Sequence, residues 1–148
     1  MRVVALSGGV GGAKLAYGLN QVLASDSLSI IANTGDDFIH HGLPVSPDID
    51  TLIYTLAGLN DSDRGWGLAG ETWAFMEAMG PLGGDTWFNL GDRDLAMHVL
   101  RREALDGGQP LSVFTDRIRN ALQISARIFP MSDTRVSTLV ETVEEGLL

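Results

Sequence analysis

The chain has 148 residues, no cysteine, and 10 basic against 19 acidic residues, which gives a formal net charge of −9. Without cysteine it has no disulfide framework, no zinc–thiolate site and no thiol nucleophile, and so acidic a chain lacks the basic face of an unspecific nucleic-acid binder. Hydrophobic residues make up 45% of it and no apolar run is as long as a membrane-spanning helix, so we expect a cytoplasmic protein whose partners are small molecules, not nucleic acid or membrane.

A β-rich run at residues 3–6 predicts the first strand, and a glycine-rich segment follows it. Residues 7–14 have the sequence Ser-Gly-Gly-Val-Gly-Gly-Ala-Lys, and apolar residues then recur at helical spacing through residue 23. In such a strand, glycine loop and helix, backbone N–H groups and the helix dipole can hold phosphate. Neither standard fingerprint is met, because Lys14 replaces the third glycine of the dinucleotide pattern and is not followed by serine or threonine as in a P-loop. We predict a phosphate-binding loop of Gly9, Gly11, Gly12 and Lys14; the alternative is a tight turn without a ligand.

Four carboxylates follow the second predicted strand, Leu28–Ala32. They belong to Asp36, Asp37, Asp48 and Asp50, and the last two begin a predicted helix with Ser46 as its N-cap. Clustered carboxylates repel one another unless a cation or a proton compensates their charge. Hard oxygen ligands without cysteine suit Mg²⁺ or Mn²⁺. The cluster therefore predicts a site for one of these ions, and the alternatives are ordinary turn and capping residues or, for Asp36, a contact to a ribose hydroxyl.

The second half of the chain alternates apolar runs with turn signals, which predicts three more helices, a strand and a final hairpin. The helices are expected at residues 71–79, after Asp92 as N-cap with His98 inside the helix, and after Ser112 as N-cap. The strand is expected at residues 126–129, and the hairpin begins with a strand at residues 136–143 and has its turn at residues 144–146.

Strands that alternate with helices predict the fold class. We expect an α/β, Rossmann-like fold, with a mainly parallel sheet flanked by helices, in a single domain of residues 1–148. Ligands of such sheets bind beyond the carboxyl ends of the strands. The glycine loop and the acidic loop both leave the sheet at that edge.

Six short motifs follow one another along the chain. They are Ser-Gly-Gly-Val-Gly-Gly-Ala-Lys at residues 7–14, Asn-Thr-Gly-Asp-Asp at 33–37, Ser-Pro-Asp-Ile-Asp-Thr at 46–51, Arg-Gly-Trp-Gly at 64–67, Leu-Gly-Asp-Arg-Asp at 90–94 and Pro-Met-Ser-Asp at 130–133. Each motif alone is weak, but in this order they resemble the 2-phospho-L-lactate transferase family of coenzyme F420 biosynthesis. The resemblance covers essentially the whole chain and only the N-terminal portion of a family member, which continues into a further nucleotide-binding portion.

This resemblance implies a Mg²⁺-dependent transferase. A ribityl hydroxyl of the deazaflavin Fo would attack the phosphorus of lactyl-diphospho-guanosine, a GTP-derived donor, or of its enolpyruvyl analogue, and GMP would leave. By matching position, Asp50 and Arg93 resemble residues that contact the deazaflavin, and Asn33 is a further expected substrate contact. Asp36 and Asp50 are the expected metal ligands and the candidate catalytic residues, with Asp48 as a reserve ligand for the metal.

The sequence leaves two other functions open. A nicotinamide oxidoreductase fits the opening strand, glycine loop and helix, although Lys14 and the aspartate cluster do not suit it. A truncated, non-catalytic deazaflavin-binding domain fits a chain that stops within its last hairpin. Because the remaining nucleotide-binding portion of the family is not among these residues, we expect the chain alone to bind Fo without turnover and to form a homo-oligomer.

Overall fold

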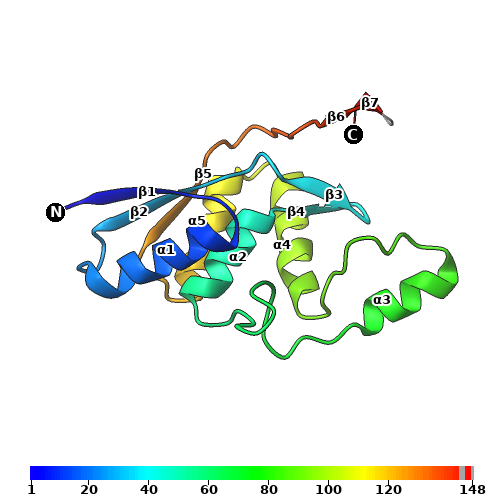
Figure 1. The fold of residues 1–148 in the computed structure, drawn as a ribbon, viewed down its shortest axis with the longest axis horizontal. Helices are drawn as coiled ribbons and strands as arrows, with labels where there is room; N and C mark the ends of the chain where they lie inside the picture. The colour runs from blue at the N-terminus through cyan, green and yellow to red at the C-terminus, as the bar shows by residue number, and fades with distance from the viewer. Residues whose placement is uncertain (144–145, 148) are drawn as a thin grey trace.

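The computed structural model describes residues 1–143 and 146–147. Its central sheet has the strand order β1 (Val3–Ser7), β2 (Leu28–Ala32) and β5 (Arg127–Pro130), and all three strands are parallel (Figure 1). Parallel neighbours need a crossover connection, which helix α1 (Gly9–Val22) supplies between β1 and β2. The predicted α/β fold with a parallel sheet is confirmed.

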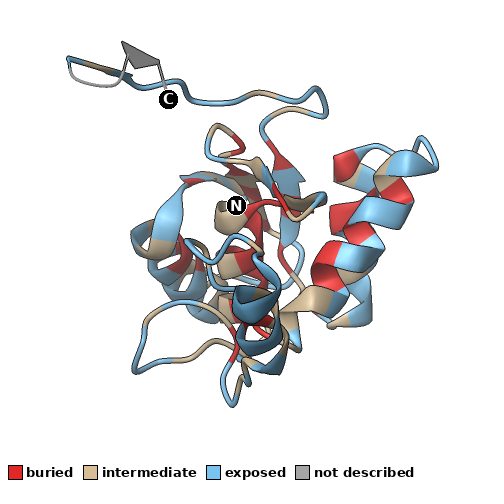
Figure 2. Cartoon of the chain, turned by 90° about the vertical axis from the view of Figure 1, so that its right-hand side faces the viewer, coloured by how far each residue is buried: buried red, intermediate tan, exposed pale blue. Residues whose placement is uncertain are grey.

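One face of this sheet forms the core. Alternate residues such as Ala5, Ile30 and Ile128 stand in register on that face, where they pack with helices α1, α2 (Pro47–Leu56) and α5 (Leu111–Ala121). The intervening residues point the other way, and Val4 and Leu6 are 64% and 76% exposed. Figure 2 shows the same division as buried residues concentrated between the sheet and the helices.

Helix α1 begins inside the glycine segment, so the predicted loop is shorter than expected. Gly9 is the first helical residue and has a φ of +60°. A Cβ on Gly12 would lie 2.6 Å from Ser7 Oγ and 3.0 Å from its Cα, whereas one on Gly11 would have no atom within 4 Å. Gly12 therefore allows the helix to pack closely on β1, the role of the third glycine in the dinucleotide pattern.

A small antiparallel hairpin of β3 (Phe38–His40) and β4 (Leu43–Val45) lies within the stretch that we predicted as a loop. Its turn is His41-Gly42, and both residues have positive φ, 49° and 75°, as two-residue hairpin turns require. Val45 packs there with residues of the next segment, around helix α3 (Ala74–Met79) and the 3₁₀ turn η1 (Gly80–Leu82), in a second small core.

At the N-termini of two helices, the capping carboxylate comes from the segment next to the other helix. Asp92 was predicted to cap its own helix, α4 (Asp94–Asp106), but its oxygens accept the N–H groups of Ala74 and Phe75 at 3.0 and 2.9 Å, at the start of α3. Glu71 instead accepts the N–H groups of Arg93 and Asp94, at 2.7 and 3.1 Å, at the start of α4. The prediction for Asp92 is wrong because a partner distant in sequence supplies the cap.

Of the two predicted serine caps, Ser46 occupies the N-cap position of α2 without making the capping hydrogen bond, and the prediction for Ser112 is wrong. Ser46 precedes α2, but its hydroxyl donates to Asp37 Oδ2 at 2.7 Å and makes no bond to the helix. Ser112 lies inside α5, which begins at Leu111, and its backbone N–H and hydroxyl both donate to Asp133. In the folded chain each serine hydroxyl lies close to an aspartate and donates its hydrogen bond to that carboxylate.

The chain ends in a short hairpin in which β6 (Glu141–Thr142) pairs antiparallel with β7 (Gly146–Leu147). The strand expected over residues 136–143 is thus limited to two residues, and its predicted turn falls largely on residues 144–145, outside the described residues. Among the helices that the structure describes, none has the length and apolar character needed to cross a bilayer.

Candidate active site

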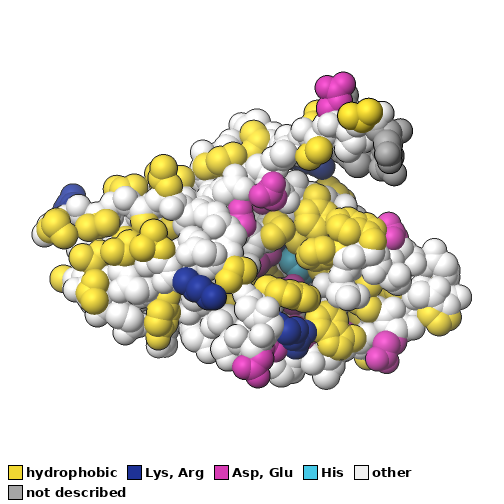
Figure 3. All heavy atoms as spheres, in the orientation of Figure 1, with side chains coloured by type: hydrophobic (Ala, Val, Ile, Leu, Met, Phe, Trp, Pro, Cys, Tyr) yellow, Lys and Arg dark blue, Asp and Glu magenta, His cyan; other side chains and the backbone are white. Residues whose placement is uncertain are grey.

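The carboxyl ends of the parallel strands open into one pocket of about 640 Å³. Gly8 follows β1, Asn33 follows β2 and Met131 follows β5, and all three line it. Asp36 of the acidic loop and Asp48 of the first turn of α2 complete the wall. In the space-filling view, acidic side chains gather beside the ends of these strands (Figure 3). This is the edge of the sheet at which the sequence predicts ligand binding.

Asn33 joins the two carboxylates of this pocket. Its Nδ2 donates to Asp48 Oδ2 at 2.7 Å and to Asp36 Oδ2 at 3.1 Å, and its Oδ1 accepts the N–H of Gly35 at 3.0 Å. The other oxygen of Asp48 accepts the N–H of Gly9 at 2.7 Å. The Asp48 carboxylate therefore already accepts the N–H of Gly9, the first residue of α1, and an anionic ligand bound here would lie close to this negative charge.

The residues of the predicted phosphate loop are only partly brought together. Gly9 lines the pocket and Gly12 packs against β1, while Gly11 faces open space. Lys14 lies more than one helical turn beyond Gly9 and lines a different cavity, together with Tyr17 at the surface. The structure thus places Gly8 and Gly9 at the pocket and the lysine charge outside it.

Asp50 follows Asp48 by two residues but is turned into the core. Its two oxygens accept hydrogen bonds from Arg101, Oδ2 from Nη1 at 3.1 Å and Oδ1 from Nη2. Arg101 is fully buried, and its Nη1 also donates to the carbonyl oxygen of Pro44 at 3.1 Å. Burial opposes the charge of Arg101, yet the Asp50 carboxylate raises its pKa above the ordinary value. Asp50 is not among the described residues that line the pocket of Asp36.

The buried ion pair belongs to a larger network between α2 and α4. His98 lies 3.3 Å from Arg101 through Nδ1 and 3.0 Å from Asp94 Oδ2 through Nε2. The Asp94 carboxylate also accepts the hydroxyl of Tyr54. Burial would raise the pKa of Asp94, but the hydrogen bonds from His98 and Tyr54 hold it below its usual range. We did not predict this network from the sequence. Residues 94, 98 and 101 share one helix face, however, and polar residues on a buried helix face indicate a hydrogen-bonded network.

Arg93, the second expected deazaflavin contact, lies elsewhere. Its side chain is exposed, and Nη1 donates to the carbonyl oxygen of Ala69 at 2.8 Å. It lines a shallow cavity of about 260 Å³ with Tyr54 and Met97. Asp50 is not among the described residues that line this cavity.

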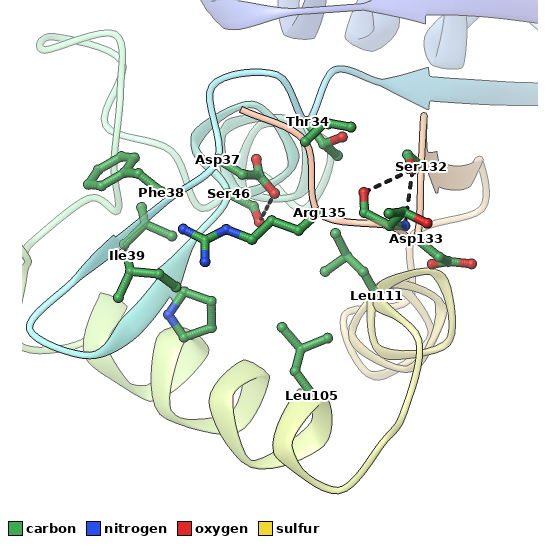
Figure 4. Close-up of a pocket in the computed structure, with 14 residues that line it drawn as sticks. Thr34, Asp37, Phe38, Ile39, Ser46, Leu105, Leu111, Ser132, Asp133 and Arg135 are labelled. Carbon is green, nitrogen blue, oxygen red and sulfur yellow. Dashed lines mark hydrogen bonds between the residues drawn. The ribbon is translucent and has the colours of Figure 1, made fainter. Parts of the chain in front are cut away.

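Asp37 is a functional candidate to which the sequence analysis assigned no role of its own. It lines an apolar cavity of about 200 Å³ beside the hairpin and is hydrogen-bonded to Ser46, with Leu105 and Leu111 across the cavity (Figure 4). Burial raises the pKa of Asp37 to about 6, although the Ser46 hydroxyl acts in the opposite direction. Only its position next to Asp36 could have indicated it, because its burial depends on the hairpin that follows.

The pocket residues fit a hard divalent cation in part. Asp36 and Asp48 offer carboxylate oxygens to one open pocket, which suits Mg²⁺, an ion that often takes one or two carboxylates and leaves its other positions to water and phosphate. Asp50 fits less well, since it is buried against Arg101 and is not among the described residues that line this pocket. Within the described residues, no group of three or more Asp, Glu, His or Cys side chains is arranged to hold a metal.

Comparisons with known proteins give the chain a family context. A family model described as 2-phospho-L-lactate transferase CofD matches residues 3–147. A protein from Streptomyces griseus with the name phosphoenolpyruvate transferase is 44% identical over 147 residues, covering 99% of this chain and 46% of that protein. A protein of the same name from Nocardia farcinica is 45% identical over 140 residues, covering 94% and 42%. The chain thus spans about half the length of these relatives.

The fold has a counterpart among solved structures. A crystal structure of a UPF0052-family protein from Bacillus halodurans superposes with a TM-score of 0.55 at 16% identity. The match covers 100% of this chain and 45% of that protein. At this identity the likeness supports the fold alone.

Proposed function

Because the chain belongs to the 2-phospho-L-lactate transferase CofD family, we propose that it takes part in the transfer of a phosphoenolpyruvyl or phospholactyl group to the deazaflavin Fo in coenzyme F420 biosynthesis. The relatives named phosphoenolpyruvate transferase favour the enolpyruvyl donor. The observation that supports this function best is the pocket at the strand ends, in which Asn33 holds Asp36 and Asp48 together beside the start of α1.

In the proposed reaction a ribityl hydroxyl of Fo attacks the phosphorus that bears the enolpyruvyl or lactyl group. A new O–P bond forms, the bond from that phosphorus to the GMP oxygen breaks, and GMP leaves with the electron pair. The hydroxyl proton passes to a carboxylate. Asp36 is the base that the geometry favours, because it is exposed in the pocket, and Asp50 keeps its predicted role as a contact to Fo.

The diphosphate of the donor would lie against the N-terminus of α1. There the backbone N–H groups of Val10 and Gly11 belong to the first helical turn and can donate to phosphate oxygens, whereas that of Gly12 already donates to the carbonyl oxygen of Gly8. Asp48 already occupies the N–H of Gly9, so its charge opposes an incoming diphosphate unless a cation lies between them. A bound Mg²⁺ supplies that screening and can polarise the phosphorus, with Asp36 and Asp48 as its ligands. Lys14, outside the pocket, adds a positive charge on the same helix.

The direct test supplies the purified protein with Fo, Mg²⁺ and either enolpyruvyl- or lactyl-diphospho-guanosine and follows GMP release by chromatography. The sequence predicts Fo binding without turnover for these residues alone. Where GMP release is detected, Asp36→Asn should reduce its rate by about a hundredfold or more, the usual contribution of a general base. The matched control is Asp63→Asn, which changes an exposed acid of a distant loop and should leave the rate unchanged. Fo binding without GMP release would reduce the proposal to a deazaflavin-binding role, and the absence of both would refute it.

A further inference from the structure

Arg101 is the most deeply buried charge among the described residues, and its role is not explained by stability. A buried ion pair is weak support for a fold, because apolar side chains of similar volume often serve as well or better. Arg101 is 0% exposed and its Nε has no hydrogen-bond partner. A buried guanidinium with one unsatisfied N–H donor therefore points to a role in orienting another group.

The geometry of the guanidinium shows what it orients. Its planar fork meets both oxygens of Asp50, which fixes the plane as well as the position of that carboxylate. The bond from Nη1 to the carbonyl oxygen of Pro44 ties the same group to the β3–β4 hairpin. Arg101 thus holds α2, α4 and the hairpin in one arrangement around Asp50.

His98 completes the arrangement by fixing the direction of the hydrogen bonds. Asp94 can only accept when ionised, so Nε2 of His98 donates to it and carries the proton. Nδ1 is then an acceptor 3.3 Å from Nη1 of Arg101, which has two hydrogens for this nitrogen, Asp50 Oδ2 and the Pro44 carbonyl oxygen, so that one hydrogen is shared. Arg101 therefore donates to His98, and His98 donates to Asp94. The guanidinium group of Arg101 also donates to both oxygens of Asp50.

We propose that Arg101 is a positioning residue that, supported by His98, holds Asp50 in the orientation in which it accepts a hydrogen bond from a hydroxyl or N–H group of the acceptor substrate. Each Asp50 oxygen has a lone pair left after its bond to Arg101, and 8% of the side-chain surface remains exposed. The inference rests on the proposed function, in which Asp50 contacts Fo. Substrate recognition then depends on a residue that never touches the substrate.

The test compares Arg101→Met and Arg101→Lys with the matched control Arg102→Met. Arg102 is the next residue of the same helix, but it is exposed and pairs with Asp106. Two quantities are measured for each folded variant: Fo affinity by fluorescence titration, and the χ1 couplings of Asp50 by NMR. The unfolding free energy is recorded alongside, so that an effect on stability alone is recognised. Asp50→Asn reports whether Fo binding depends on Asp50 at all.

If Arg101 positions Asp50, Arg101→Met averages the Asp50 χ1 couplings and weakens Fo binding by about tenfold or more, the size of loss found when a residue that orients a metal ligand is removed. Arg101→Lys, which keeps the charge but not the fork, restores a single rotamer in part and binds Fo between Arg101→Met and the wild type. Arg102→Met matches the wild type in both measurements. Should Arg101→Met fail to fold, Arg101→Lys decides by the same two measurements.

An Asp50 rotamer that stays fixed in both Arg101 variants would overturn the inference, as would wild-type Fo affinity in Arg101→Met when Asp50→Asn has lost binding. A wild-type protein that does not bind Fo would refute the proposed function instead. In that case the rotamer measurement still decides whether Arg101 positions Asp50.

Discussion

Asp48 and Asp50 lie two residues apart in the first turn of α2, and their surroundings differ completely. Asp48 lines the open pocket, where it bonds Asn33 and the N–H of Gly9. Asp50 is buried and bonded to Arg101. Two residues along a helix correspond to about 200° of rotation, so the two side chains leave on opposite sides. The same residue type thus lines a partly exposed pocket in one case and makes a buried ion pair in the other.

The largest expected effect separates the two aspartates by stability. Asp50→Ala leaves Arg101 buried without its partner and should lower the free energy of unfolding by about 3–5 kcal/mol. Asp48→Ala removes hydrogen bonds at a partly exposed site and should lower it by about 1 kcal/mol. Urea unfolding followed by tryptophan fluorescence measures both.

A double variant sharpens this test. Asp50→Leu combined with Arg101→Met removes both charges and should recover most of the stability lost in Asp50→Ala, since apolar replacement of a whole buried pair is often neutral or better. Equal losses for Asp48→Ala and Asp50→Ala would mean that the two sites do not differ as the structure describes.

The next effect concerns the glycines that bring α1 to the pocket. Gly12→Ala places a Cβ 2.6 Å from Ser7 Oγ and should destabilise the protein by about 1–3 kcal/mol, because the strand cannot move aside freely. Gly11→Ala meets no atom within 4 Å and should be neutral or gain up to about 1 kcal/mol through helix propensity. Thermal unfolding of both variants measures the difference, and equal melting temperatures would show that α1 does not pack closely on β1.

Metal binding tests whether the open pocket or the predicted pair with Asp50 holds the cation. Asp36→Asn and Asp48→Asn should each weaken Mn²⁺ binding by about tenfold or more. Removing a residue that merely orients a metal ligand already costs that much affinity, and a ligand itself should cost no less. Asp50→Asn should have a smaller effect, because Asp50 is buried against Arg101 and is not among the described residues that line the pocket. Electron spin resonance titration with a guanosine diphosphate ligand present reads the affinity, with Asp63→Asn as control. A larger loss in Asp50→Asn than in Asp48→Asn would restore the ligand pair expected from the sequence.

The smallest effect is a pH dependence from Asp37, which lies between the two regions. Its pKa is about 6 in the folded protein against an ordinary 3.8, so the folded state holds this proton more tightly than the unfolded chain. The protonated form therefore stabilises the fold below about pH 4, and this contribution is lost as the pH rises through 6. Allowing for partial exposure, we expect a loss of about 1 kcal/mol.

Asp37→Asn should remove this decline and be the more stable form at pH 7. The measurement is the difference in unfolding free energy between wild type and variant from pH 4 to 7, because other carboxylates such as Asp92, whose pKa is lowered by hydrogen bonds from Thr72 and Phe75, change stability in the opposite sense. A difference that is constant over this range would contradict the raised pKa.

Much of the fold could be predicted because its signals are local. Apolar periodicity located β2 at its observed bounds, and Pro47 marked the start of α2. The caps could not be predicted, because Asp92 and Glu71 each serve the other's helix across about twenty residues of chain. Short polar side chains accept whichever donor the fold brings near, and sequence spacing does not show which that is.

The sequence by itself determined the order of the three sheet strands and the main helices, the glycine segment after β1, and the presence of several aspartates at one edge of the sheet. Those features depend on periodicity, backbone preference and the rule that parallel strands end together. Only the tertiary structure decided that Asp48 faces the pocket, that Asp50 faces Arg101, and that Lys14 lies outside the pocket. The physical reason is that the side to which a helix points its charged side chains depends on which of its faces is buried. Arg101 is fifty-one residues from Asp50 in the chain, and it becomes the partner of Asp50 only when the fold brings α4 to α2.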